Sequence, residues 1–282
     1  MPSNNRFNTV VIVDSIPDGQ MNTARRLWDD LRDISNEFSP VPRIEYARVE
    51  SADDFARAIT TVCVRVRTEG IHPLVHLEAH GDEHGLELAL GARVDWTHVK
   101  ETLTPLNIAM ELNLLLVLAA CHGGTFIESI RLADRAPVWG LIGPTNQLSV
   151  ARVQADFAAF YKTMFKTLSP SKAIEALNSN APTGLYFRTT AEGLFYKAWR
   201  LYKDTHCTDE QLQVRAKRMY RRAKDEGMDP LPSVGHLKRR LLSTEPASFN
   251  KFRDKYFMYD LFPEHAARFA VTYQSAGTRS AR

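Results

Sequence analysis

Residues 112–124 have the sequence LNLLLVLAACHGG, the most apolar stretch of the chain. A continuous apolar run bounded by turn residues is typical of a strand that is buried on both faces of a sheet. Here the run extends over residues 112–119, and the two glycines after it predict a turn. The stretch therefore predicts a buried strand whose carboxyl end presents the thiol of Cys121 at one edge of a sheet.

A second strand-like run, residues 72–79, ends in the same way, on His80 and Gly81. The helical patterns between the runs have apolar residues at a spacing of three and four. Strands that alternate with helices predict an α/β fold, with a mostly parallel sheet of about six strands covered on both faces. The predicted strands are residues 9–13, 44–49, 72–79, 112–119, 137–142 and 185–188.

Four chemistry-bearing positions follow the ends of these strands. In mostly parallel sheets the functional site lies beyond the carboxyl ends of the strands. Asp14, His80 and Cys121 each stand at such an end, and Gly143 follows a fourth. The sequence thus predicts one site along one rim of the sheet.

Composition bounds the class of protein. The 282 residues are 44% hydrophobic and 24% charged, which is ordinary for a globular chain. Three widely spaced cysteines argue against a disulfide framework and for a reducing compartment. The start of the chain has no apolar signal-peptide core, and the longest apolar run is too short to cross a membrane. We therefore expect a cytoplasmic protein that does not associate with membranes.

Charge divides the chain into two parts. Residues 183–282 hold 19 Lys and Arg against 11 Asp and Glu, a net charge of +8 (19 − 11). The remaining 17 and 22 give residues 1–182 a net charge of −5 (17 − 22). Such asymmetry suggests two units with different roles. We predict an α/β domain over residues 1–190 and a basic helical extension over residues 191–282.

The pairing of Cys121 with His80 predicts covalent catalysis. A helix predicted over residues 125–133 would favour a negative charge at its start and so lower the pKa of the thiol. His80 would take the thiol proton and return it to the leaving amine, with Glu78 or Asp82 as candidates to orient the ring. The N–H groups of Gly81 and Cys121 would stabilise an oxyanion. The alternative is a cysteine that is merely buried in the core.

The two strand ends, His80-Gly81 and residues 119–123 (AACHG), resemble those of the caspase-like cysteine peptidases, especially the bacterial branch with CHAT-type domains. The family signature has Gln and Arg, Gln or Gly where this chain has Ala119 and His122, with a histidine roughly 50 residues upstream. Here the separation is 41 residues (121 − 80). The resemblance covers about residues 9–190. It implies a three-layer sandwich, a Cys121–His80 dyad with Gly81 as an oxyanion donor, and no metal or organic cofactor.

The same resemblance implies a substrate pocket. In this family the end of the first strand lines the pocket for the residue before the cut, and Asp14 occupies that place. A carboxylate there would select Arg or Lys of a protein substrate. The segment after the fifth strand, with Gly143, Thr145 and Asn146, would form another wall. The alternative is that Asp14 only caps the turn after its strand.

The resemblance also implies a biological setting, because comparable bacterial proteases often act in stress or defence after a regulatory protein partner releases them. Two other functions stay open. The chain could be a non-catalytic binding module that recruits protein or nucleic acid through the basic run of residues 215–224, or a hydrolase of a non-protein acyl group. For the basic run itself, a solvated helix face is the simpler interpretation. A zinc site among His72, His76, His80 and His84 is disfavoured, because a strand does not bring residues four apart together as a helix does.

Overall fold

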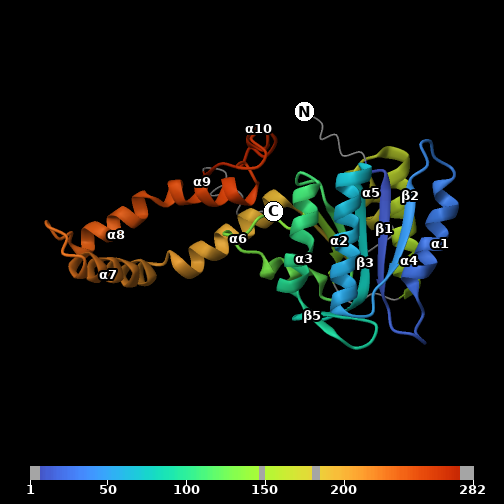
Figure 1. Ribbon diagram of the computed structural model, residues 1–282, viewed down its shortest axis with the longest axis horizontal. Helices are drawn as coiled ribbons and strands as arrows, with labels where there is room; N and C mark the ends of the chain where they lie inside the picture. The colour runs from blue at the N-terminus through green and yellow to red at the C-terminus, as the bar shows by residue number, and fades with distance from the viewer. Residues whose placement is uncertain (1–6, 146–149, 180–184, 274–282) are drawn as a thin grey trace. The chain divides into compact units, whose positions relative to one another are not determined.

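The computed structural model describes residues 7–145, 150–179 and 185–273 (Figure 1). The chain divides into two compact units, residues 1–130 with 136–191, and residues 131–135 with 192–282. In chain order the first unit contains β1 (Thr9–Ser15), α1 (Thr23–Ser35), β2 (Arg43–Arg48), α2 (Ala52–Glu69), β3 (Pro73–Gly81), β4 (Gly85–Glu87), β5 (Arg93–Asp95), α3 (Trp96–Ala109), β6 (Leu115–Ala119), the 3₁₀ helix η1 (Gly123–Ser129), β7 (Gly140–Pro144), α4 (Val150–Thr167), α5 (Pro170–Asn178) and β8 (Tyr186–Thr190).

One sheet organises the first unit. Its strands run in the order β2-β1-β3-β6-β7-β8, and every neighbouring pair is parallel except β7 and β8. The short strands β4 and β5 form an antiparallel hairpin that continues from the end of β3, with Gly91 at φ +80° in its turn. The predicted α/β class and mostly parallel sheet are confirmed.

Apolar strands and amphipathic helices build the core of this unit. All seven residues of β1 are buried, as its β-branched run predicts. Alternate residues of β1 and β6, together with Leu74 of β3, pack with apolar side chains of α1, α4 and α5 into one cluster. The other two helices, α2 and α3, contact each other and lie on the opposite side of the sheet (Figure 1). The sheet is therefore covered on both faces.

Several predicted boundaries differ from the structure around β6. The strand begins at Leu115 instead of residue 112, because the preceding N–H groups bond elsewhere. The Leu112 N–H donates to the Asn107 carbonyl, and the Leu114 N–H donates to Asn107 Oδ1 at 3.0 Å. The segment before β7 bonds to the same side chain, since Asn107 Nδ2 donates to the Ala136 carbonyl at 2.7 Å, and β7 begins at residue 140 instead of 137.

The second unit is helical. It contains α6 (Ala191–His206, whose first residue belongs to the sheet unit), α7 (Asp209–Asp225), α8 (Val234–Ser243), α9 (Glu245–Tyr256) and α10 (His265–Arg268). Buried aromatic rings form its core: Phe195 lies 5.2–5.4 Å, centroid to centroid, from Phe249, Tyr256 and Phe257. The helical content of this region follows the sequence prediction, while the short segment 131–135 joins the unit from outside the predicted range.

Candidate active site

The strands that carry His80 and Cys121 are neighbours. β3 and β6 pair in parallel with a register that runs from Leu74 opposite Leu115 to Glu78 opposite Ala119. The pairing ends there, and His80 and Cys121 each lie two residues beyond this last pair, His80 still within β3 and Cys121 in the turn after β6. The expected juxtaposition of the two strand ends is therefore present.

The backbones of the two strand ends touch. A Cβ placed on Gly81 would lie 2.6 Å from the Cys121 carbonyl oxygen and 3.2 Å from the Ala120 Cβ. No side chain tolerates such a contact with a backbone atom, so only glycine fits at position 81. The close approach fixes the turn that carries the thiol against the end of β3.

Cys121 lies half-buried in a turn, and its electrostatics differ from the prediction. The Gly123 N–H closes the turn on the Ala120 carbonyl at 3.1 Å, and His122 adopts a left-handed conformation with φ 57°. The next element is the short 3₁₀ helix η1, which begins two residues after the thiol, instead of an α-helix over residues 125–133. Burial raises the pKa of the Cys121 thiol, and its own backbone N–H offsets this only in part. The predicted lowering of that pKa is wrong, because desolvation exceeds the stabilisation of the thiolate.

His80 is exposed and bonds to a residue that the sequence did not single out. Its Nε2 lies 2.7 Å from Oε1 of Gln20, in the loop between β1 and α1. Within residues 7–145, 150–179 and 185–273, no hydrogen bond joins the imidazole to the Cys121 thiol. The structure thus places the two groups at adjacent strand ends without a direct bond between them. Because β1 and β3 are neighbouring strands, the loop after β1 lies beside the end of β3. A prediction of this strand order could have identified Gln20 as a neighbour of His80.

The two acids considered as orienting groups for His80 have other partners. Glu78 is buried, accepts the Thr23 hydroxyl and lies 3.4 Å from Nε2 of the buried His76. Asp82 pairs with Arg93 and accepts the His84 N–H at 2.8 Å. These interactions lower the pKa of Asp82 to about 2, with the Arg93 hydrogen bond as the largest cause. Both acids stabilise the surroundings of His80, and neither binds its ring.

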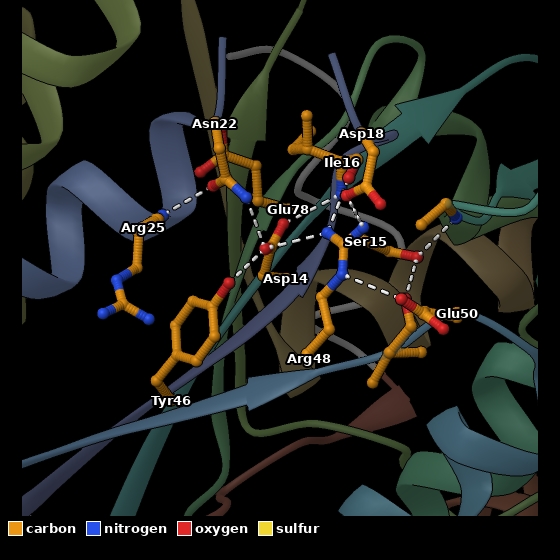
Figure 2. A network of polar contacts seen from close by, with 12 residues as sticks. Asp14, Ser15, Ile16, Asp18, Asn22, Arg25, Tyr46, Arg48, Glu50 and Glu78 are labelled. Carbon is orange, nitrogen blue, oxygen red and sulfur yellow. Dashed lines mark hydrogen bonds and ion pairs between the residues drawn. The ribbon is translucent and has the colours of Figure 1, made fainter. Parts of the chain in front are cut away.

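Asp14 is the centre of a buried polar network (Figure 2). Its carboxylate is fully buried and accepts four donors: the Ile16 N–H at 2.9 Å, Asn22 Nδ2 at 2.6 Å, Arg48 Nη1 at 3.0 Å and the Tyr46 hydroxyl. Burial, together with the nearby Asp14, raises the pKa of Tyr46 to about 12. The carboxylate is therefore occupied by the protein's own arginine. Because the carboxylate is fully buried and paired with Arg48, it does not support the predicted preference for Arg or Lys before the cut.

The same network fixes the loop that carries Gln20. Arg48 donates to the Ile16 carbonyl at 2.6 Å and to Asp18 at 3.0 Å, at the start of the loop (Figure 2). At its end, Asn22 caps α1 by accepting the Arg25 N–H at 2.7 Å, while its amide nitrogen binds Asp14. Asp14 thus has a structural role, and through this loop it is linked to the residue that bonds to His80.

The other predicted pocket residues form a close-packed edge. Gly143 is buried in β7, where an added Cβ would lie 2.7 Å from the Leu118 carbonyl and 2.9 Å from the Phe187 ring. Thr145 is exposed and its hydroxyl donates to the Leu185 carbonyl at 2.9 Å. Asn146 lies outside the described residues. Gly143 therefore serves the packing of β7 between β6 and β8.

Comparison with known proteins adds no further constraint. No protein-family model matches the chain, and no curated protein matches it either.

In the described part of the chain, no group of three or more His, Cys, Asp or Glu residues could hold a metal ion. Among the same residues, no helix has the length and apolar character needed to cross a bilayer.

Proposed function

We propose that the chain is a cysteine endopeptidase with Cys121 as the nucleophile and His80 as the acid and base. One observation carries the proposal: the neighbouring parallel strands β3 and β6 end side by side, with the Gly81 and Cys121 backbones in contact. Active sites of mostly parallel sheets lie at this edge. A thiol and an imidazole at adjacent strand ends are the two groups that nucleophilic acyl transfer needs.

The proposed reaction has two steps. The Cys121 sulfur forms a bond to the peptide carbonyl carbon while its proton passes to His80, and the C–N bond breaks as His80 returns that proton to the amine. Water then attacks the thioester, gives a proton to His80 and releases the carboxylic acid as the thiol is restored. The N–H groups of Gly81 and Cys121 are the proposed donors to the oxyanion. Because burial raises the thiol pKa, proton transfer accompanies attack, and the resting enzyme holds little preformed thiolate.

Labelling with a peptidyl acyloxymethyl ketone tests the proposal. We expect the probe to modify Cys121 in the wild type, and His80→Ala to slow this labelling by about 10²-fold or more, since the base is lost. The matched control is His122→Ala, which removes the adjacent exposed imidazole and should label at the wild-type rate. Iodoacetamide reacts with the thiolate and needs no enzymatic base, so the midpoint of its pH dependence at Cys121 should lie above that of an exposed thiol, because burial raises the Cys121 pKa. Peptide mapping by mass spectrometry measures all three.

Absence of probe labelling at Cys121 in the folded wild type would contradict the proposal and favour a non-catalytic binding module. Equal labelling of the wild type and His80→Ala would contradict the role of the imidazole. Cys207, which is also half-buried, serves as an internal reference for nonspecific reaction.

Gln20 is the proposed positioning residue for the base. Because its amide oxygen faces Nε2, the neutral imidazole carries its proton there and leaves Nδ1 to accept the proton of Cys121. Gln20→Glu places a carboxylate at the same position. We expect the acidic limb of the pH–rate profile to move up by about one pH unit, since a nearby negative charge favours the imidazolium. The pH dependence of kcat/KM measures the shift.

The control for this change is Gln211→Glu, which adds the same charge on α7 of the helical unit. It should leave the pH–rate profile unchanged. Apart from position 20, the ionisable groups near His80 are the same in both variants: Glu87 opposite it on β4, Asp82 paired with Arg93, and Cys121 at the neighbouring strand end. An unshifted acidic limb in Gln20→Glu would show that the Gln20 contact does not form in the active enzyme.

A further inference from the structure

One side of α7 carries a dense row of cations. Arg215, Lys217, Arg218, Arg221, Arg222 and Lys224 lie within ten residues of this helix, and all are exposed except the half-buried Arg215. We call these six residues the α7 basic face. The buried residues of the helix are Leu212, Ala216 and Ala223. At about 3.6 residues per turn they fall on the side opposite the cations, so the apolar side packs within the unit and the basic side meets solvent.

Most of the charge on this face is uncompensated. Arg222 pairs with Glu226 at 2.7 Å, and Arg215 approaches the Tyr202 hydroxyl and the His206 carbonyl. The other four cations, Lys217, Arg218, Arg221 and Lys224, have no ion-pair or hydrogen-bond partner for their side chains among the residues that the structure describes. Residues 192–282 contain 18 Lys and Arg against 11 Asp and Glu, an excess of seven (18 − 11), and the α7 basic face holds six of these cations. A partner of negative charge would meet little competition from the chain's own acids.

The neighbouring helix adds to the positive surface. α8 packs against α7 and carries Lys238, Arg239 and Arg240 in succession. Lys238 contacts Asp209 near the start of α7, which neutralises one acid there. Arg239 and Arg240 are exposed. The acids on α7 itself are Asp209 and Glu210 in the first turn and Asp225 at the last position, outside the stretch from residue 215 to 224.

We propose that the α7 basic face binds the phosphate backbone of a nucleic acid. Four of its six cations are arginines, whose planar guanidinium groups bind phosphate oxygens in pairs. Lys217, Arg221 and Lys224 stand on successive turns about 5.4 Å apart, close enough to engage several phosphates at once. An anionic membrane fits less well, because the apolar side that would enter lipid is buried within the protein.

The chemistry of the face predicts the kind of binding. Phosphate contacts supply affinity and no base readout, so binding should be independent of sequence and fall steeply with salt. Tyr220, the aromatic residue of α7, is half-buried, so stacking of bases should add little to the phosphate contacts. Discrimination between sequences of equal length is therefore expected to be small.

The test measures binding of the full chain to a 30-base-pair DNA duplex and a 30-nucleotide RNA by fluorescence anisotropy over a range of salt. For the duplex we compare the wild type with Lys217→Gln/Arg221→Gln/Lys224→Gln. The variant should bind about 10- to 100-fold more weakly, and the slope of log affinity against log salt should shrink by about 3. The matched control is Arg67→Gln/Lys172→Gln/Lys251→Gln, three exposed cations elsewhere with the same change in net charge. It should stay within about twofold of the wild type, because none of the three cations belongs to the α7 basic face.

Each possible result of this binding experiment either supports or contradicts the proposal. Binding to duplex or RNA that is lost in the α7 variant and kept in the control supports the proposal. Equal loss in the two variants, salt-independent binding, or binding only to vesicles of phosphatidylserine would overturn it. Thermal unfolding of both variants near the wild-type temperature shows that the fold is intact. Since the readout is binding, it does not depend on whether Cys121 cleaves peptides.

Discussion

Replacing Cys121 with alanine is expected to abolish peptide hydrolysis. Loss of the nucleophile removes the covalent step, so the rate should fall by about 10⁴-fold or more. The thiol is half-buried and small, and we expect thermal unfolding within a few degrees of the wild type. The measurement is digestion of a peptide library, with products identified by mass spectrometry. A peptidase should return cuts that share a residue before the broken bond.

The control is Cys207→Ala, which removes the other half-buried cysteine of the described chain and should leave hydrolysis unchanged. Full proteolysis by Cys121→Ala would refute the proposed nucleophile. If the wild type leaves every peptide intact but hydrolyses small thioesters or esters through Cys121, the reaction class is acyl hydrolysis on a non-protein substrate. The cleaved positions would also define the residue preference, for which the buried Asp14 offers no basis.

The second large effect is expected at Asp14. Asp14→Ala leaves the Ile16 N–H, the Tyr46 hydroxyl and the Asn22 amide without their acceptor and removes the buried partner of Arg48. Removing one member of a buried ion pair costs about 3 kcal/mol or more. Urea denaturation should show this loss in the free energy of unfolding of the sheet unit. In Asp14→Asn, the pKa of Tyr46 should fall below about 12, since two of the causes that raise it come from Asp14.

Asp18→Ala provides a matched comparison, because Asp18 pairs with the same arginine at the same 3.0 Å but its side chain is 94% exposed. A surface pair contributes at most about 1 kcal/mol, so this variant should lie close to the wild type. Similar stabilities of the two variants would contradict the central role of Asp14. Because the network holds the loop that carries Gln20, Asp14→Ala should also disturb His80, which its NMR ring signals would report.

Long apolar runs made most of the sheet predictable. The β-branched run of β1 and the leucine-rich β6 can be buried on both faces only in the interior of a covered sheet, and helical spacing identified the helices between them. Boundaries failed where a side chain replaced a strand partner. The Asn107 side chain on α3 binds both Leu114 and Ala136, and no periodicity in the sequence signals such bonds between a helix and two loops.

The location of the site was predictable from the sequence, but the hydrogen-bond partners of its residues were not. Strand ends located His80, Cys121 and Asp14 because topology decides which rim they share. The partner of His80 depends on the path of one loop, and Gln20 lies there as an exposed polar residue with no pattern around it. The sign of the thiol pKa shift depends on how burial compares with local dipoles. Burial of a turn follows from packing in three dimensions, which the sequence order does not supply.

The absence of a side chain at position 81 limits how this protein can be redesigned. Any larger residue there would displace the Cys121 carbonyl and with it the turn that carries the sulfur. Attempts to alter substrate choice would then have to leave the junction of the two strands untouched and vary the segments around it. The loop between β1 and α1 is the segment best suited to such substitutions. Its residues between Asp18 and Met21 are exposed, while hydrogen bonds anchor its two ends.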